Sequence, residues 1–199
     1  MKRFRGHAAF AWTVVSCAGF AAAQNPSFEL SVKAPSEIIE PAGTVAGYGA
    51  VVQVTTTGLL ETDPGAQGWS ISIGIEGGGA ISDATIAGTA SEVALTGGFT
   101  TTELTSGPGN EGAVSAVVLS FKKPLTLPPS GTADILALEV EVTVPQPVDI
   151  EGEPACDPLL SRLVLVNGRQ GSGQPVDNKI TYLGETILPT LGEDRKSVV

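Results

Sequence analysis

Two glutamates in the stretch 135–144 are the first residues whose type and spacing could do chemistry. Glu139 and Glu141 are two positions apart, so in an extended strand both side chains point to one face, about 7 Å from each other. Paired carboxylates at such a distance can serve glycoside hydrolysis as acid and as base or nucleophile. Because no cleft, aromatic subsite or acid-raising environment can be read around them, a solvated sheet face is the simpler interpretation.

Acidic loops offer a second kind of chemistry, the binding of a hard cation through oxygen ligands. The run DIEGEPACD covers residues 149–157, and PVDN covers residues 175–178. An EF-hand loop needs glycine at its sixth position and glutamate at its twelfth, and a count from Asp149 meets neither requirement. A plain acidic surface loop and a looser calcium site both remain open. The calcium candidates are Asp149, Glu151, Glu153, Asp157 and Asp177.

Histidine and cysteine usage excludes several reaction classes. The only histidine, His7, lies in an N-terminal segment that reads as a signal peptide, so the rest of the chain has no Ser-His-Asp triad, no Cys-His pair and no histidine-ligated zinc. Cys17 lies in the same segment, which leaves Cys156 without a partner in the chain and rules out a disulfide framework. No combination of residues in the sequence indicates a catalytic reaction, and we expect a protein that is not an enzyme.

Trp69 could stack against a sugar ring or fill a hydrophobic core. In the run WSISIGI it shares one strand face with Ile71, Ile73 and Ile75, while serines and a glycine occupy the other face. A sugar-stacking tryptophan needs polar neighbours on the solvent face. Because Trp69 instead alternates in step with three isoleucines, we predict that its side chain lies between two sheets. Beyond residue 23 the chain has six aromatic residues, too few for the flat row that binds cellulose or chitin.

Both ends of the chain are predicted to lie outside the fold. Residues 1–23 have the order of a signal peptide: a basic start, an apolar stretch too short to span a bilayer, and small residues before Gln24. A lipid-attachment site at Cys17 is the alternative. Residues 194–199, DRKSVV, are similar to translated read-through of a sequencing adapter and are interpreted as a scar, with a natural basic tail as the alternative. We expect an exported protein, secreted or at the cell surface.

Residues 24–193 are enough for one domain with a sizeable core. They hold six of the 11 basic and 20 of the 21 acidic residues, so their formal net charge is −14. Such a surface repels nucleic acid and anionic lipid, because it has no cationic stripe to displace counterions.

Short apolar runs alternate with turns rich in glycine and proline, and long helical periodicity is missing. This pattern is typical of an all-β protein. The predicted strands are Phe28–Val32, Val51–Thr57, Trp69–Ile75, Ala80–Ala87, Val114–Phe121, Ile135–Val144, Leu159–Val166, Lys179–Tyr182 and Glu185–Leu188. We therefore predict a two-sheet sandwich of jelly-roll or Ig-like type with about nine strands.

Four stretches, taken in order, resemble the cohesin-like modules of exported bacterial proteins, particularly those of Planctomycetes-type genomes. They are QGWSISI, GAVSAVVLSF, TLPPSGTADILALEVEV and QPVDNKITYLGETILPTL, and the resemblance runs from about Phe28 to Leu191. It implies a jelly-roll sandwich that is related in fold to some carbohydrate-binding modules. It also implies calcium-assisted, non-catalytic docking of a dockerin through one sheet face, at the cell surface or in a multi-enzyme complex.

We therefore expect an exported docking or structural module of a larger surface or secreted protein, with a dockerin-like or other surface protein as its partner. The alternative is a carbohydrate-binding module attached to a polysaccharide-degrading enzyme or adhesin, which would need Trp69, Tyr48 and Tyr182 together on one solvent face. A hydrolase would instead need carboxylates that converge in a pocket with a shifted pKa. Calcium is the only cofactor that the residues suggest.

Overall fold

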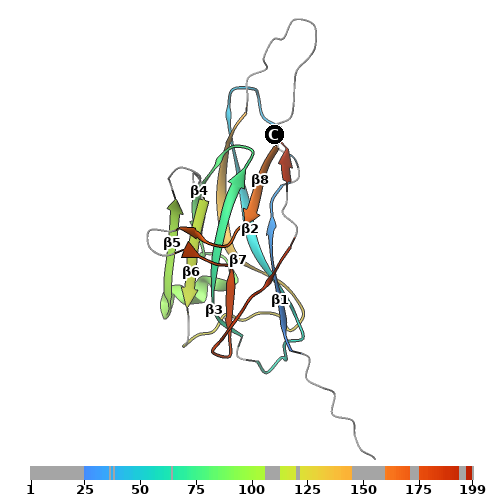
Figure 1. The fold of residues 1–199 in the computed structure, drawn as a ribbon, viewed down its shortest axis with the longest axis vertical. Helices are drawn as coiled ribbons and strands as arrows, with labels where there is room; N and C mark the ends of the chain where they lie inside the picture. The colour runs from blue at the N-terminus through green and yellow to red at the C-terminus, as the bar shows by residue number, and fades with distance from the viewer. Residues whose placement is uncertain are drawn as a thin grey trace, which may run out of the picture.

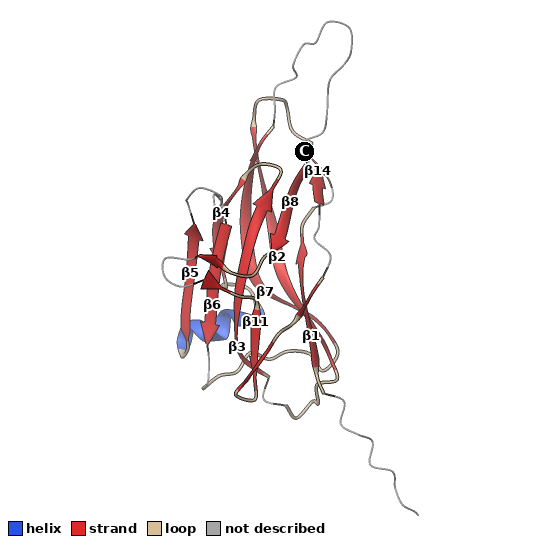
Figure 2. Ribbon diagram, in the orientation of Figure 1, coloured by secondary structure: helices blue, strands red, loops and turns tan. Residues whose placement is uncertain are grey.

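Two β-sheets pack face to face and form a sandwich in the computed structural model (Figures 1 and 2). The structure describes residues 25–35, 37, 39–63, 65–105, 113–119, 122–144, 160–170, 175–192 and 196–198. The strands are β1 (Ser27–Lys33), β2 (Val45–Thr57), β3 (Ala66–Glu76), β4 (Ala80–Thr85), β5 (Phe99–Thr105), β6 (Ala113–Leu119), β7 (Gly131–Thr143), β8 (Leu160–Leu165), β9 (Arg169–Gln170), β10 (Pro175–Val176), β11 (Lys179–Tyr182), β12 (Glu185–Ile187), β13 (Thr190–Leu191) and β14 (Lys196–Val198). A 3-10 helix, η1 (Ala90–Thr96), follows β4, and no helix in these ranges is long and apolar enough to cross a membrane.

The first sheet has the strand order β13-β1-β2-β7-β4. Its longest ladder joins β2 to β7, which pair antiparallel from Val45 opposite Thr143 to Thr56 opposite Gly131. At one edge β13 runs parallel to β1, and the backbone nitrogen of Gly192 continues this pairing by donating to the carbonyl oxygen of Leu30 at 2.7 Å.

The second sheet has the order β12-β11-β3-β6-β5. Strand β6 covers one edge of β3, while β11 and β8 share the other edge. β11 pairs with β3 as far as Ser70, and β8 takes over at Ile73. This edge of β3 therefore passes from β11 to β8 between Ser70 and Ile73, a junction called the fork below. Neither strand pairs with Ser72, so another group must form the hydrogen bond to its backbone nitrogen.

Alternating side chains build the core between the sheets. Trp69 is 2% exposed and Ile71 and Ile73 are 0% exposed, which confirms the predicted inward face, and Ile75 packs against the same core half-buried. From the other sheet, the inward positions of β2 and β7 meet them, with Val52 and Leu136 fully buried. Burial of each large aliphatic side chain contributes about 1.5–3 kcal/mol, so this layer supplies the main driving force for folding.

The predicted sandwich is confirmed, and each of the nine predicted strands has a counterpart. Within the described ranges nine strands have four residues or more, and five short ones bring the total to fourteen. Three differences stand out. β2 begins at Val45 and not at Val51, β5 was not predicted, and η1 occupies a segment that the sequence left unassigned. The early part of β2 carries glycines on its outward face, and β5 is a threonine-rich run without apolar alternation.

Two predicted terminal segments have different outcomes. Residues 1–23, the predicted signal peptide, lie outside the described residues, so that assignment stays a prediction. Part of the tail that was interpreted as a scar forms a short strand, because β14 pairs antiparallel with residues 160–162 of β8. The origin of the tail residues stays a prediction.

Candidate binding surfaces

Trp69 is a core residue whose polar atom is satisfied inside the protein. Its indole nitrogen donates a hydrogen bond to the Ser91 hydroxyl at 2.8 Å. The backbone nitrogen of Ser91 in turn donates to the hydroxyl oxygen of Thr89, the residue that caps η1. Tyr48 and Tyr182 are 7% and 5% exposed. The three aromatic residues that a sugar platform would need are therefore buried, and the carbohydrate-binding interpretation loses that platform.

The carboxylate pair of β7 lies on a solvent-exposed sheet face. Glu139 and Glu141 are both exposed and pair with Gly49 and Gly47 of β2 on one side. On the other side Glu139 pairs with Asp83 of β4, so two carboxylates stand opposite each other. In the part of the chain that the structure describes, no three His, Cys, Asp or Glu side chains are grouped to hold a metal. The solvated-face interpretation is confirmed for these glutamates.

The calcium candidates fall largely outside the described residues. Asp149, Glu151, Glu153 and Asp157 all do, so a calcium site in their loop stays a prediction. Asp177 is described, and its carboxylate forms an ion pair with the ammonium group of Lys179 at 3.0 Å.

The PVDN segment closes the fork in the edge of β3. The side-chain oxygen of Asn178 accepts a hydrogen bond from the backbone nitrogen of Ser72 at 3.0 Å. The Asn178 amide nitrogen donates to the side-chain oxygen of Asn167, also at 3.0 Å, and Asn178 is only 2% exposed. Beside it, the Ser70 hydroxyl donates to the carbonyl oxygen of Asp177 at 2.6 Å. The sequence offered this segment as a candidate for binding a ligand. In the structure, the Asn178 side chain instead supplies the backbone hydrogen bond that a neighbouring strand would form at the fork.

The outer faces of both sheets carry charged residues, but they also include an uncharged row. The first sheet exposes carboxylates from Glu29, Glu139 and Glu141 and the ammonium group of Lys33, and the second sheet carries Lys179. On the second sheet a row of paired residues crosses the strands, from Phe99 on β5 through Leu119 and Gly68 to Thr181 on β11. Phe99 is 58% exposed, and Leu119 is half-buried. This row carries no charge, and it begins with an exposed aromatic ring.

Gly68 allows the residues of that row to pack closely, because it has no side chain. A Cβ atom at Gly68 would lie 2.3 Å from the carbonyl oxygen of Val118 and 2.7 Å from the Cδ2 atom of Leu119. The side chain of Leu119 therefore lies directly over the backbone of β3, in the space that any larger residue would fill.

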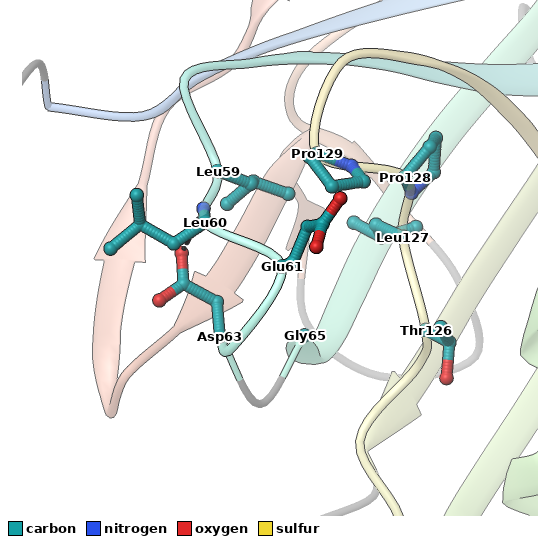
Figure 3. Close-up of a pocket in the computed structure, with 9 residues that line it drawn as sticks. All are labelled: Leu59, Leu60, Glu61, Asp63, Gly65, Thr126, Leu127, Pro128 and Pro129. Carbon is teal, nitrogen blue, oxygen red and sulfur yellow. Dashed lines mark hydrogen bonds between the residues drawn. The ribbon is translucent and has the colours of Figure 1, made fainter.

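A pocket of about 450 Å³ opens between the loop that follows β2 and the loop that precedes β7 (Figure 3). Its apolar walls come from Leu59, Leu127, Pro128 and Pro129. Glu61 and Asp63 add carboxylates. Sequence reasoning missed this pocket, because its two loops lie more than sixty positions apart and no spacing pattern joins them.

Asp63 is held in its charged form. The hydroxyl of Tyr182 and the backbone nitrogen of Leu60 donate to its carboxylate, and these bonds lower the pKa of Asp63, the tyrosine bond having the larger effect. Burial, and then the hydrogen bond to Asp63 and its charge, raise the pKa of Tyr182 to about 12. A general acid needs a raised carboxyl pKa, so Asp63 is shifted in the wrong direction for a hydrolase.

Comparison with known proteins finds likeness at the level of structure. No protein-family model matches the chain, and no curated protein matches its sequence. Two of the similar solved structures are type I cohesin–dockerin complexes from Clostridium thermocellum, Coh-OlpA-Doc918 and Coh-OlpC-Doc435. Both are 10% identical over 86% of this chain, covering 98% and 92% of those chains, with TM-scores of 0.53 and 0.54. A third is the third ScaC cohesin from Acetivibrio cellulolyticus, solved with the ScaB dockerin, at 12% identity over 86% of this chain and 98% of that one, with a TM-score of 0.51. At these identities the likeness establishes the fold, which is that of the cohesin jelly roll.

Proposed function

We propose that this chain is a non-catalytic docking module that binds a dockerin-like protein through the outer face of the sheet formed by β5, β6 and β3. The observation that carries the proposal is the likeness to three cohesins, each solved together with a dockerin. The likeness spans 86% of this chain, so it concerns the whole sandwich and not a shared motif. Fold alone does not assign a partner, and the surface of the chain supplies the second argument.

The uncharged row from Phe99 to Thr181 favours the β5–β6–β3 face for docking. Covering the carboxylates of the first sheet would remove them from water, which is costly unless each meets a partner charge. The row from Phe99 to Thr181 has no charge to desolvate. An exposed aromatic ring is a typical anchor in an interface, and stable docking buries about 1,200–2,000 Å² in total. Phe99 supplies such an anchor.

The proposal places the module outside the cell. The predicted signal peptide of residues 1–23 and the strongly acidic surface of residues 24–193 support export, at the cell surface or in a secreted assembly. Calcium bound by Asp149, Glu151, Glu153 and Asp157 belongs to the same proposal.

A pull-down from the secreted fraction of a culture of the source organism tests the proposal. Wild-type protein is the bait, with and without a calcium chelator, and retained proteins are identified by mass spectrometry. We expect a retained protein that contains a dockerin-like domain, which is then purified and its binding measured by calorimetry. Phe99→Asp should weaken that binding at least tenfold, because it puts a charge at the anchor.

Val45→Asp is the matched control. Val45 is 62% exposed on the outer face of β2, so the same chemical change is made at a similarly exposed site on the other sheet. It should leave binding unchanged. Failure to retain any dockerin-like protein would count against the function, and a loss of binding in Val45→Asp but not in Phe99→Asp would count against the chosen face.

A further inference from the structure

The pocket of Figure 3 is preformed, because hydrogen bonds join its two loops to each other at both ends. The backbone nitrogen of Leu59 donates to the carbonyl oxygen of Pro129 at 3.2 Å. At the other end Ala66 and Leu125 exchange two backbone hydrogen bonds, of 3.1 and 2.7 Å. Gly65, between these contacts, has φ +83°, and a Cβ there would lie 2.0 Å from the Leu125 oxygen, so only glycine allows this close approach.

The pocket combines apolar walls with one unengaged carboxylate. Leu59 and Leu127 are 6% and 8% exposed, and the rings of two prolines complete the wall. Figure 3 shows the Glu61 carboxylate directed between Leu127 and Pro129, whereas Asp63 turns toward Leu60. Among the described residues no hydrogen bond or ion pair engages Glu61, and the pocket lining contains no Lys, Arg or His.

We propose that this pocket binds a basic side chain, a lysine or an arginine, of a partner protein. Such a side chain has a methylene stem that packs on the leucine and proline walls and a cationic head that reaches Glu61. A second negative charge nearby, on Asp63, strengthens the attraction, and the −14 formal charge of residues 24–193 steers cations toward the surface. The inference rests on the proposed docking function only in assigning the side chain to a partner protein.

Titration of isotope-labelled protein with Nα-acetyl-lysine N-methylamide, followed by NMR, tests the pocket without any partner. Nα-acetyl-norleucine N-methylamide is the matched probe, since it keeps the aliphatic chain and lacks the charge. We expect shifts at the backbone amides of Glu61 and Leu127, and binding about fivefold tighter for the lysine probe than for the norleucine probe. The preference should shrink in 0.5 M salt, because exposed charges are screened.

Glu61→Gln should abolish the preference for the lysine probe, and Glu139→Gln, the same change at an exposed position on β7, should keep it. Equal binding of the two probes, or a lysine preference that survives Glu61→Gln, would overturn the inference. Glu61 is exposed, so the variant should fold, and an unchanged spectrum away from the pocket verifies this. Failure here leaves docking through the β5–β6–β3 face intact, because Phe99→Asp reports on that face separately.

Discussion

The indole nitrogen of Trp69 donates to the hydroxyl of Ser91 across 2.8 Å, deep between the two sheets. This bond joins strand β3 to the helix η1, which belongs to neither sheet. Ser91 is 0% exposed, so the indole N–H has no access to water as a substitute partner. The helix therefore closes the core beneath the tryptophan and supplies the one polar atom that the ring requires.

Ser91→Ala should destabilise the fold by about 1–3 kcal/mol, because it leaves the buried indole N–H without an acceptor. Urea unfolding at equilibrium measures the change, and the slope of the transition should stay constant if the fold is unaltered. Ser82→Ala is the control, since Ser82 is exposed on β4 and should lose little. Equal effects of the two changes would contradict the role given to Ser91.

The Tyr182–Asp63 bond predicts a loss of stability at alkaline pH. The folded protein holds the pKa of Tyr182 at about 12, above its usual 10.0, so this contribution is complete below pH 10 and is lost as pH rises toward 12. On the acid side the pKa of Asp63 lies below its usual 3.8, so its contribution is present above pH 3.8 and is lost as pH falls through the lower value.

Tyr182→Phe isolates this effect from the other groups that titrate at high pH. The difference in urea midpoint between wild type and variant should narrow as pH rises from about 9 to about 11.5. A difference that stays constant over this range would show that the tyrosine hydroxyl is not held protonated by the fold.

Two strand glycines should respond in opposite ways to alanine. Gly68→Ala should cost about 1–3 kcal/mol, because its Cβ would meet the carbonyl oxygen of Val118 at 2.3 Å. At Gly49 a Cβ would meet nothing within 4 Å, so Gly49→Ala should be neutral or stabilise by about 0.5–1 kcal/mol. Thermal unfolding of both variants measures the contrast, and a similar cost at each position would refute it.

Removal of the side chain that closes the fork should also be costly. Asn178→Ala leaves the buried backbone nitrogen of Ser72 without its acceptor, which costs about 1–3 kcal/mol. The side-chain oxygen of Asn167 loses one of two donors and keeps the backbone nitrogen of residue 178. Hydrogen exchange checks the position directly, since the Ser72 amide should lose its protection while that of Val52, in the middle of the other sheet, keeps its own. Unchanged protection at Ser72 would contradict the assignment.

The sandwich could be predicted from sequence because its core strands alternate cleanly. From Trp69 to Ile75 in β3 and from Leu136 to Val142 in β7, every second residue is large and apolar, and one register alone turns all of them inward. The same logic failed for β5, where threonines occupy both faces and leave no inward stripe. It also failed for η1, whose seven residues are too few to display helical periodicity.

The candidate surfaces were harder to predict because they depend on contacts between distant segments. The carboxylates of Glu139 and Glu141 were assigned correctly to solvent, since strand phase alone determines their face. Nothing local connects Glu61 with Leu127, or Phe99 with Gly68. The structural role of Asn178 was missed for the same reason, because its partners on β3 and beside β8 are known only after the strands are placed.

The parallel pairing of β1 and β13 determines how this protein would resist mechanical load. The chain enters β1 at Ser27 and leaves β13 at Gly192, and in parallel strands these two points lie toward opposite ends of the pair. Tension applied through them slides one strand along the other and does not peel them apart. The hydrogen bonds that join Glu29 and Leu30 to β13 would then be loaded together and not one after another.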